Sequence, residues 1–415
     1  MPRLAGAFFI PGRSWACLHS PNGINDLNGL GAVIELPDCV LDEHSARWLP
    51  DGDHAFAAMS ALIDGACESV CLESYLVRAG EPALSLLAAL QRARARGVRV
   101  RLLCDAFGSE GLPTGFFDGL VADGGEWRVF SPARRLRLAF RDHRKLLVCD
   151  GRRAIVGGLN IGPEYLGDGV RRGWRDLALQ IEGPVVTALA ASFEAMYALA
   201  PVTTTAIREF RRTARRIPAV PGTAVALLQS GPGWPVGQLW RALRSDLAQA
   251  REVHCMAAYF LPPRRMRWAL RRVTEAGGSV QLLLAGRSDV PVARYAAEHL
   301  YARMLAGGAR LYEYQPQILH GKLLIMDDTV YMGSCNLDRR SLNINYELLL
   351  RLHWPQLAAQ GRELFATSLA HSREVAAASW RARRRWWEGL RARAAYWLLT
   401  RIDPLLARRR LRSLG

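Results

Sequence analysis

The feature that most constrains the fold of this 415-residue chain is an internal repeat. The segments HRKLLVCD (143–150) and HGKLLIMD (320–327) both follow the pattern His-x-Lys-x4-Asp, and 177 residues separate the two histidines. A glycine-asparagine element follows each segment, GGLN (157–160) in the first half and GSCN (333–336) in the second. Self-similarity over this length predicts two similar structural units joined in one chain.

The similarity also extends upstream of each motif, where strand-like segments alternate with helical ones. The matching strand segments are VCLESYLV (70–77) with VHCMAAYFL (253–261) and RGVRVRLLCD (96–105) with GGSVQLLLAG (277–286), and the expected helices are 83–95 and 264–276. This order predicts an α/β fold of two similar lobes, each a mixed β-sheet flanked by helices. The expected boundaries are an irregular segment 1–50, lobe one 51–200, a linker 201–222, lobe two 223–370 and a tail 371–415.

The two lysines of the chain are Lys145 and Lys322, among 55 basic residues. Each follows a motif histidine by two positions, so on a strand both side chains point the same way. Arginine replaces lysine freely on a solvated face, but not where a compact ammonium group must fit beside a phosphate. We therefore expect both lysines to neutralise phosphate oxygens in a transition state, with hydrogen bonds added by Asn160 and Asn336.

Histidine can form a covalent intermediate with phosphorus, and a second histidine can protonate the leaving oxygen. A nucleophilic histidine also needs a carboxylate to fix its tautomer. Asp176 follows His143 by 33 residues and Glu347 follows His320 by 27, so each is a candidate to orient the histidine that precedes it, whereas a salt-bridged carboxylate at a strand edge fits the spacing equally well. The motif residues Asp150 and Asp327 have the opposite strand parity to the histidines, which places them at turns.

At this point the residues resemble a known family. Two complete His-x-Lys-x4-Asp motifs, each followed by a Gly-Gly/Ser-x-Asn element, are similar to the phospholipase D superfamily and within it to bacterial cardiolipin synthases, most of all the cardiolipin synthase B-like branch. The resemblance covers about residues 52–370. It implies a pseudo-two-fold axis between the lobes and one active site at their interface.

The resemblance also implies transfer of a phosphatidyl group between two phosphatidylglycerol molecules, without a metal or other cofactor, through a phosphohistidine. His143 is then the nucleophile and His320 the acid and later the base, with Lys145, Lys322, Asp150 and Asp327 in the catalytic signature. Water, phosphatidylethanolamine or another alcohol remain open as substrates, and so do a nuclease of the same superfamily and a non-catalytic binding protein.

The formal net charge of +17 predicts a polyanionic partner, either an anionic membrane or a nucleic acid. Residues 381–415 carry eleven arginines, with tryptophan and tyrosine interleaved, which is typical of a helix at a membrane interface. No apolar run approaches the roughly 20 residues that span a bilayer. We expect a peripheral protein on the cytoplasmic face of the cell membrane, with nucleic-acid binding as the less favoured alternative.

Overall fold

Two mixed sheets carry the repeat in the computed structural model, which describes residues 36–130, 140–200, 202–218, 220, 222–234, 237–378, 380 and 385–402. The first sheet has the order β1 (Cys39–Leu41), β2 (His44–Leu49), β8 (Ala178–Glu182), β7 (Arg153–Gly157), β6 (Lys145–Cys149), β3 (Ser69–Ser74), β4 (Arg99–Asp105), β5 (Glu126–Phe130). The second has the order β16 (Ser372–Glu374), β12 (Arg310–Tyr314), β11 (Ser279–Ala285), β10 (Glu252–Ala257), β13 (Lys322–Met326), β14 (Thr329–Gly333), β15 (Glu347–His353), β9 (Val225–Ser230). The predicted α/β fold of two similar lobes is confirmed.

Strand pairing has the same pattern in the two sheets. Strands β3, β4 and β5 are parallel, as are β10, β11 and β12. The motif strands β6 and β13 pair antiparallel with β3 and β10, and two further antiparallel strands follow each of them. The motif strand therefore lies at the centre of each sheet, where its two ends are fixed by neighbours on both sides.

Both faces of the motif strands are apolar because each sheet is covered on both sides. In β6, Leu146 and Val148 face the core between the lobes, whereas Leu147 and Cys149 face the outer core of the first lobe. Strand β13 alternates in the same way. The sequence of β6 is KLLVC, in which every residue after the lysine is apolar. A continuous apolar run of this kind is typical of a strand that is buried on both faces.

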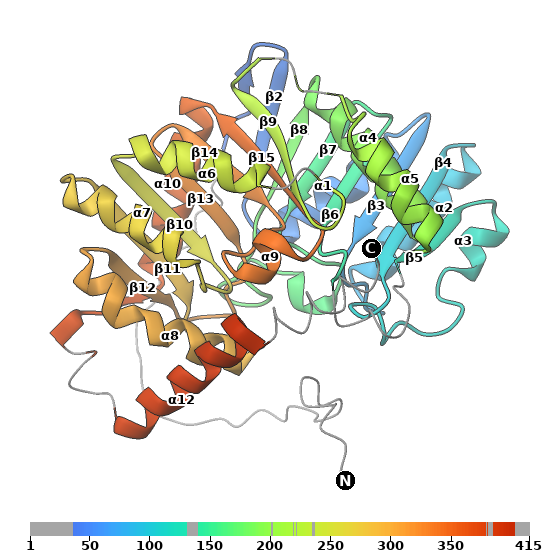
Figure 1. Ribbon diagram of the computed structural model, residues 1–415. Helices are drawn as coiled ribbons and strands as arrows, with labels where there is room; N and C mark the ends of the chain where they lie inside the picture. The colour runs from blue at the N-terminus through green and yellow to red at the C-terminus, as the bar shows by residue number, and fades with distance from the viewer. Residues whose placement is uncertain are drawn as a thin grey trace, which may run out of the picture. The chain divides into compact units, whose positions relative to one another are not determined.

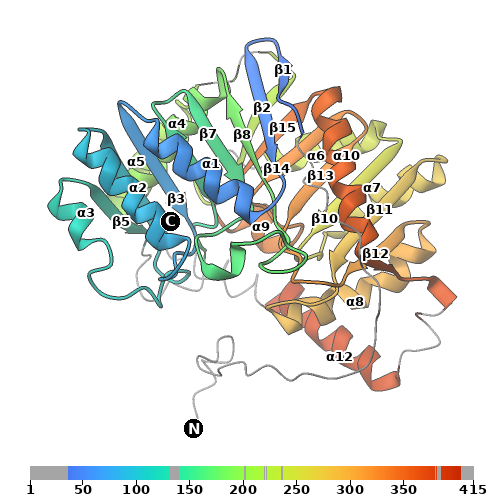
Figure 2. The same ribbon diagram turned by 180° about the vertical axis from the view of Figure 1, so that it is seen from behind.

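Helices lie on both faces of the sheets (Figures 1 and 2). The α-helices of the first lobe are α1 (Gly52–Asp64), α2 (Ala83–Ala95), α3 (Asp118–Ala122) and α4 (Val185–Leu199), with a short 3-10 turn at Pro163–Tyr165. Those that follow are α5 (Thr204–Ala214), α6 (Gln238–Gln249), α7 (Arg264–Glu275), α8 (Pro291–Ala306), α9 (Arg339–Asn343), α10 (Pro355–Ala370) and α12 (Trp386–Trp397), which continues into a π-helical turn at Leu398–Ile402. Helices α4 and α10 occupy equivalent places after β8 and β15 and line the core between the lobes.

The helices expected at 83–95 and 264–276 are confirmed as α2 and α7, the second ending one residue earlier. Three of the expected segments contain elements that the sequence did not predict. Residues 39–49 are not irregular, because β1 and β2 pair with each other and extend the first sheet through β8. The linker contains α5, and the first residues of the tail form β16 at the edge of the second sheet. Short edge strands are recognised by their neighbours more than by their own composition.

Candidate active site

Each motif aspartate closes a turn at the far end of its strand. Asp150 and Asp327 have φ angles of 55° and 49°, a left-handed conformation that aspartate tolerates in turns. The Asp150 carboxylate accepts hydrogen bonds from the backbone N–H groups of residues 67–69, and Asp327 accepts from those of residues 251 and 252. Both aspartates therefore tie the motif strand to the start of β3 or β10. The placement at turns is confirmed, whereas a direct catalytic role for them, as the family signature implied, is not supported by this geometry.

At the opposite end of the strands, the backbone of each lobe pairs with the other lobe. His143 N–H donates to the carbonyl of Tyr346 at 3.0 Å, and Tyr346 N–H donates to the carbonyl of Arg141 at 2.8 Å. The equivalent contacts of the second motif run from His320 N–H to the carbonyl of Arg175 at 2.8 Å. Tyr346 and Arg175 directly precede the two candidate carboxylates, so each carboxylate begins beside the histidine of the other lobe.

The histidine–carboxylate pairs are consequently crossed between the lobes. His143 Nδ1 lies 3.1 Å from Glu347 Oε2, and His320 Nδ1 lies 2.6 Å from Asp176 Oδ2. Both carboxylates are fully buried. The assignment of Asp176 to His143 and Glu347 to His320 is therefore wrong, although all four residues do belong to one site. An Nδ1–H that donates to the carboxylate leaves Nε2 of each histidine to face the substrate, and Lys322 Nζ lies 3.2 Å from Nε2 of His320.

The two pairs differ in their electrostatics. Burial alone would raise the pKa of Asp176, but the charges of Lys322 and His320 hold it below its ordinary value. Burial raises the pKa of Glu347 to about 8, against the opposing effects of Lys145 and the Ser334 hydroxyl. Asp176 is thus an ionised partner for His320, whereas Glu347 retains a proton more readily in its pair.

The pKa values of the histidines follow from the same surroundings. Burial, reinforced by the charges of Lys145 and Lys322, places the pKa of His143 well below its ordinary value. Burial and Lys322 also lower the pKa of His320, but Asp176 opposes them. At neutral pH His143 is uncharged, and His320 is the histidine whose protonated form has an ionised carboxylate to stabilise it.

The two lysines are buried beside the histidines. Lys145 Nζ donates to the carbonyl of His143 at 2.6 Å, and Lys322 Nζ lies 2.9 Å from Nδ1 of His320. Burial lowers the pKa of Lys145 to about 7 and also lowers the pKa of Lys322. Because these ammonium groups are buried, an anion that replaces water beside them is attracted more strongly than it would be beside an exposed lysine.

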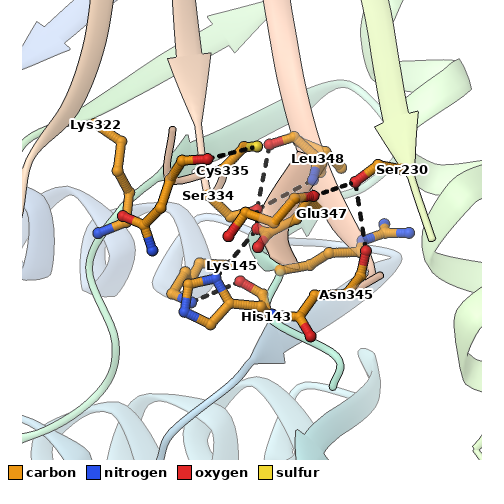
Figure 3. Close-up of polar contacts among 12 residues, drawn as sticks. His143, Lys145, Ser230, Lys322, Ser334, Cys335, Asn345, Glu347 and Leu348 are labelled. Carbon is orange, nitrogen blue, oxygen red and sulfur yellow. Dashed lines mark hydrogen bonds and ion pairs between the residues drawn. The ribbon is translucent and has the colours of Figure 1, made fainter. Parts of the chain in front are cut away.

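A serine in one lobe replaces a glycine in the other beside the carboxylates. The Ser334 hydroxyl donates to Glu347 Oε2 at 2.5 Å, so Glu347 lies between Ser334 and His143 (Figure 3). At the matching position of the first lobe, a Cβ added to Gly158 would lie only 2.4 Å from Asp176 Oδ1. Sequence reasoning missed the role of Ser334, although its place in the Gly-Ser-x-Asn element was a usable signal.

Aromatic rings flank both histidines. Tyr75 lies 4.9 Å from the ring of His143, and Tyr165 and Trp174 lie 5.1 Å and 5.6 Å from the ring of His320. The sequence analysis did not single out these three residues. By strand register Tyr75 is equivalent to Ala258, so the repeat gave no signal for it. Tyr165 and Trp174 come from the first lobe and meet His320 only in three dimensions.

The motif asparagines are buried near the same centre. Asn160 Nδ2 donates to the Tyr165 hydroxyl at 2.6 Å, so part of its amide is already engaged. Asn336 lines a small cavity together with Lys322 and has no hydrogen-bond partner for Oδ1 within the described ranges. Their contact with a phosphate stays a prediction.

Among the described residues, no three His, Cys, Asp or Glu side chains are grouped as a metal site would need. In the same part of the chain, no helix is both long and apolar enough to cross a membrane.

Comparisons with known proteins agree with this geometry. The family described as "Cardiolipin synthase, PLD-like domain" matches residues 59–197 and 243–369. A cardiolipin synthase B of Salmonella typhi is 31% identical over 371 residues, covering 86% of this chain and 88% of the relative. A cardiolipin synthase A of Pseudomonas entomophila is 32% identical over 354 residues, covering 81% of this chain and 71% of the relative.

Among solved structures, a phosphatidylserine synthase of Haemophilus influenzae has a TM-score of 0.70 at 14% identity, and the match covers 90% of this chain and 97% of that one. A polyphosphate kinase of Porphyromonas gingivalis has a TM-score of 0.54 at 15% identity, covering 81% of this chain and 49% of the kinase. At this identity the two structures support the fold alone. With the family match on both repeats and relatives that align over most of the chain, the protein belongs to the cardiolipin synthases with a phospholipase D-like domain.

Proposed function

We propose that this protein is a phosphatidyltransferase that makes cardiolipin from two molecules of phosphatidylglycerol through a phosphohistidine. The observation that carries the proposal is the pair of crossed histidine–carboxylate contacts, with a buried lysine beside each histidine. These contacts support one site with a neutral nucleophile, a general acid and two cations for a phosphodiester.

In the first half-reaction, Nε2 of His143 attacks the phosphorus of one phosphatidylglycerol. The bond between phosphorus and the headgroup glycerol breaks, and Nε2–H of His320 protonates the departing oxygen. Lys145 and Lys322 neutralise the charge that grows on the non-bridging oxygens. The bound phosphodiester adds negative charge to the site, which favours protonated forms of His320 and of both lysines.

In the second half-reaction, the neutral His320 removes the proton from the headgroup hydroxyl of another phosphatidylglycerol. That oxygen attacks phosphorus, the phosphorus–nitrogen bond breaks and His143 is released. Two in-line displacements retain the configuration at phosphorus. Ionised Asp176 favours His320 as the proton carrier, and the low pKa of His143 favours it as the nucleophile.

The proposed substrates are lipids, and the net charge of +17 suits an anionic surface. We therefore place the protein on the cytoplasmic face of the cell membrane as a peripheral protein.

The test is incubation of the purified protein with defined phospholipids, with and without EDTA, followed by product analysis. We expect a diphosphatidyl product and glycerol from phosphatidylglycerol alone, in equal yield with EDTA. Phosphatidic acid as the main product would instead indicate a hydrolase, and a requirement for phosphatidylethanolamine would change the donor or acceptor.

The histidine roles are tested with a phosphodiester whose p-nitrophenol leaving group departs without protonation. His320→Ala should retain the burst of p-nitrophenol and accumulate the phosphoenzyme, whereas His143→Ala should show neither. A covalent adduct that survives in His143→Ala would reverse the two roles.

A nuclease of the same superfamily is the second candidate, favoured by five exposed arginines on and after α5. These residues are Arg208, Arg211, Arg212, Arg215 and Arg216. Cleavage of DNA without formation of a diphosphatidyl product would select this candidate over the first.

A further inference from the structure

Helix α12 rests on the second lobe by a defined inner face. Ala392 is fully buried and Ala395 is 6% exposed, and Ala395 belongs to the outer core of that lobe. The Tyr396 ring lies 4.7 Å from that of His299 on α8, and its hydroxyl accepts a hydrogen bond of 2.8 Å from Arg267 on α7. These contacts fix the rotation of α12 about its own axis.

The opposite face of α12 carries large apolar side chains in solvent. Trp386 is 79% exposed, Leu390 is 52% exposed and Trp397 is 58% exposed. With the exposed Arg393 and Arg401, these side chains follow one another in the order Trp386, Leu390, Arg393, Trp397, Arg401. The intervals between them are four, three, four and four residues. Residues so spaced form one stripe along a helix. We name these five residues the α12 stripe.

The composition of the α12 stripe fits one class of partner. Tryptophan prefers the interface between headgroups and acyl chains, and arginine is attracted by anionic headgroups while its stem stays in the apolar layer. Tryptophan and arginine are also common in protein interfaces, but the four arginines against one glutamate in residues 385–402 favour an anionic surface. Residues 403–415 add four arginines and one aspartate in sequence, which increases the positive charge at the end of the chain.

We propose that the α12 stripe docks on the headgroup layer of an anionic bilayer while the inner face of α12 stays on α8. The proposal deepens the proposed function, since it names the surface that brings this enzyme to its lipid substrates. Helix α12 then lies in the plane of the membrane and does not cross it.

The end of α12 is also connected to the candidate active site. Arg339 donates a hydrogen bond of 3.1 Å to the carbonyl of Thr400, in the turn that follows α12. Arg339 begins α9, three residues after the motif residue Asn336. Docking of the stripe therefore holds the segment after the second motif at a fixed place relative to the lipid surface.

The experiment compares two leucines of equal exposure in the full-length protein. Leu390→Glu changes the α12 stripe, whereas Leu84→Glu changes α2 of the other lobe, where the leucine is 51% exposed. We expect Leu390→Glu to weaken binding to phosphatidylglycerol-containing vesicles by about tenfold or more, because an apolar contact is lost and a like charge is added. Leu84→Glu should bind as the wild type does, and Trp386→Ala with Trp397→Ala should repeat the effect of Leu390→Glu.

A second readout separates this proposal from the proposed function. Turnover of a monomeric short-chain phosphatidylglycerol should be unchanged in the stripe variants, whereas turnover on vesicles should fall with binding. Equal binding of Leu390→Glu and wild type to anionic vesicles would overturn the docking surface and leave the chemistry intact. If the stripe variants lost binding to single-stranded DNA while vesicle binding was unchanged, the partner of the α12 stripe would be a nucleic acid. If they lost a dimer in sedimentation while vesicle binding was unchanged, the partner would be a second copy of the chain.

Discussion

The variant Asp176→Asn tests the crossed site most directly. The carboxylate is fully buried and lies 2.6 Å from Nδ1 of His320, and the substitution keeps its size while it removes the charge. The proposed mechanism requires His320 to carry a proton at one stage of each half-reaction. Only the protonated form of His320 loses an electrostatic partner in the variant, so the effect should fall on the chemical steps.

The geometry sets the magnitude. At an effective dielectric constant of about 20, opposite unit charges 2.6 Å apart attract by about 6 kcal/mol. Each 1.36 kcal/mol in the barrier is tenfold in rate, so full loss of this attraction corresponds to about 10⁴-fold. The asparagine dipole recovers part of it, and we expect kcat to fall by about 10³- to 10⁴-fold. The same exchange beside the histidine of a serine protease costs about 10⁴-fold, which is of similar size.

The assay is formation of the diphosphatidyl product from phosphatidylglycerol vesicles, with vesicle binding measured in parallel. Asp123→Asn is the matched control, because that aspartate is exposed and distant from the motifs in sequence. Both variants should bind vesicles as the wild type does and unfold in a single transition. A loss of less than about tenfold in a folded Asp176→Asn protein would refute the role of Asp176 in supporting the charge on His320.

Three further outcomes follow from the geometry. Gly158→Ala places a Cβ 2.4 Å from Asp176 Oδ1 and should lower kcat by about a hundredfold or more, with binding to vesicles retained; near-normal turnover would contradict the close approach. Asp150→Ala removes the acceptor of the backbone N–H groups at the start of β3 and should lower the unfolding free energy by about 1–3 kcal/mol in urea, while the folded enzyme keeps kcat within about threefold. Because the pKa of Glu347 is raised to about 8, the folded state keeps a proton between about pH 4.5 and 8 that the unfolded chain has lost, so the stability of the folded state falls as pH rises through that range. Glu347→Gln should therefore gain stability relative to wild type over that range in thermal unfolding, and parallel curves would contradict the shift.

Much of the fold was predictable because the same order of strands and helices occurs twice in the sequence. The strand, helix and strand that precede HRKLLVCD also precede HGKLLIMD, and each copy supports the other. The predicted bounds of the helix at 83–95 are the same as those of α2, because its apolar residues are regularly spaced. The strands β1, β2 and β16 were missed, since a short edge strand is defined by the neighbour that it joins.

The candidate site was predictable as a set of residues but not as a set of contacts. The scarcity of lysine pointed to Lys145 and Lys322, which are both buried beside a histidine. Spacing along the chain suggested that each carboxylate serves the preceding histidine, but spacing contains no information about which lobe lies opposite. Backbone pairing between the lobes decides the question, and its signal is absent from a single sequence.

That backbone pairing also limits how substrates enter. Among the described residues, five backbone hydrogen bonds join the lobes at the motif histidines, three of them to or from Arg175 and two to or from Tyr346. A hinge motion that parted the lobes would break these bonds and separate both histidines from their carboxylates. Such an opening would disrupt the active site each time a lipid entered. Phospholipids must instead reach a centre whose two lobes stay joined by these bonds.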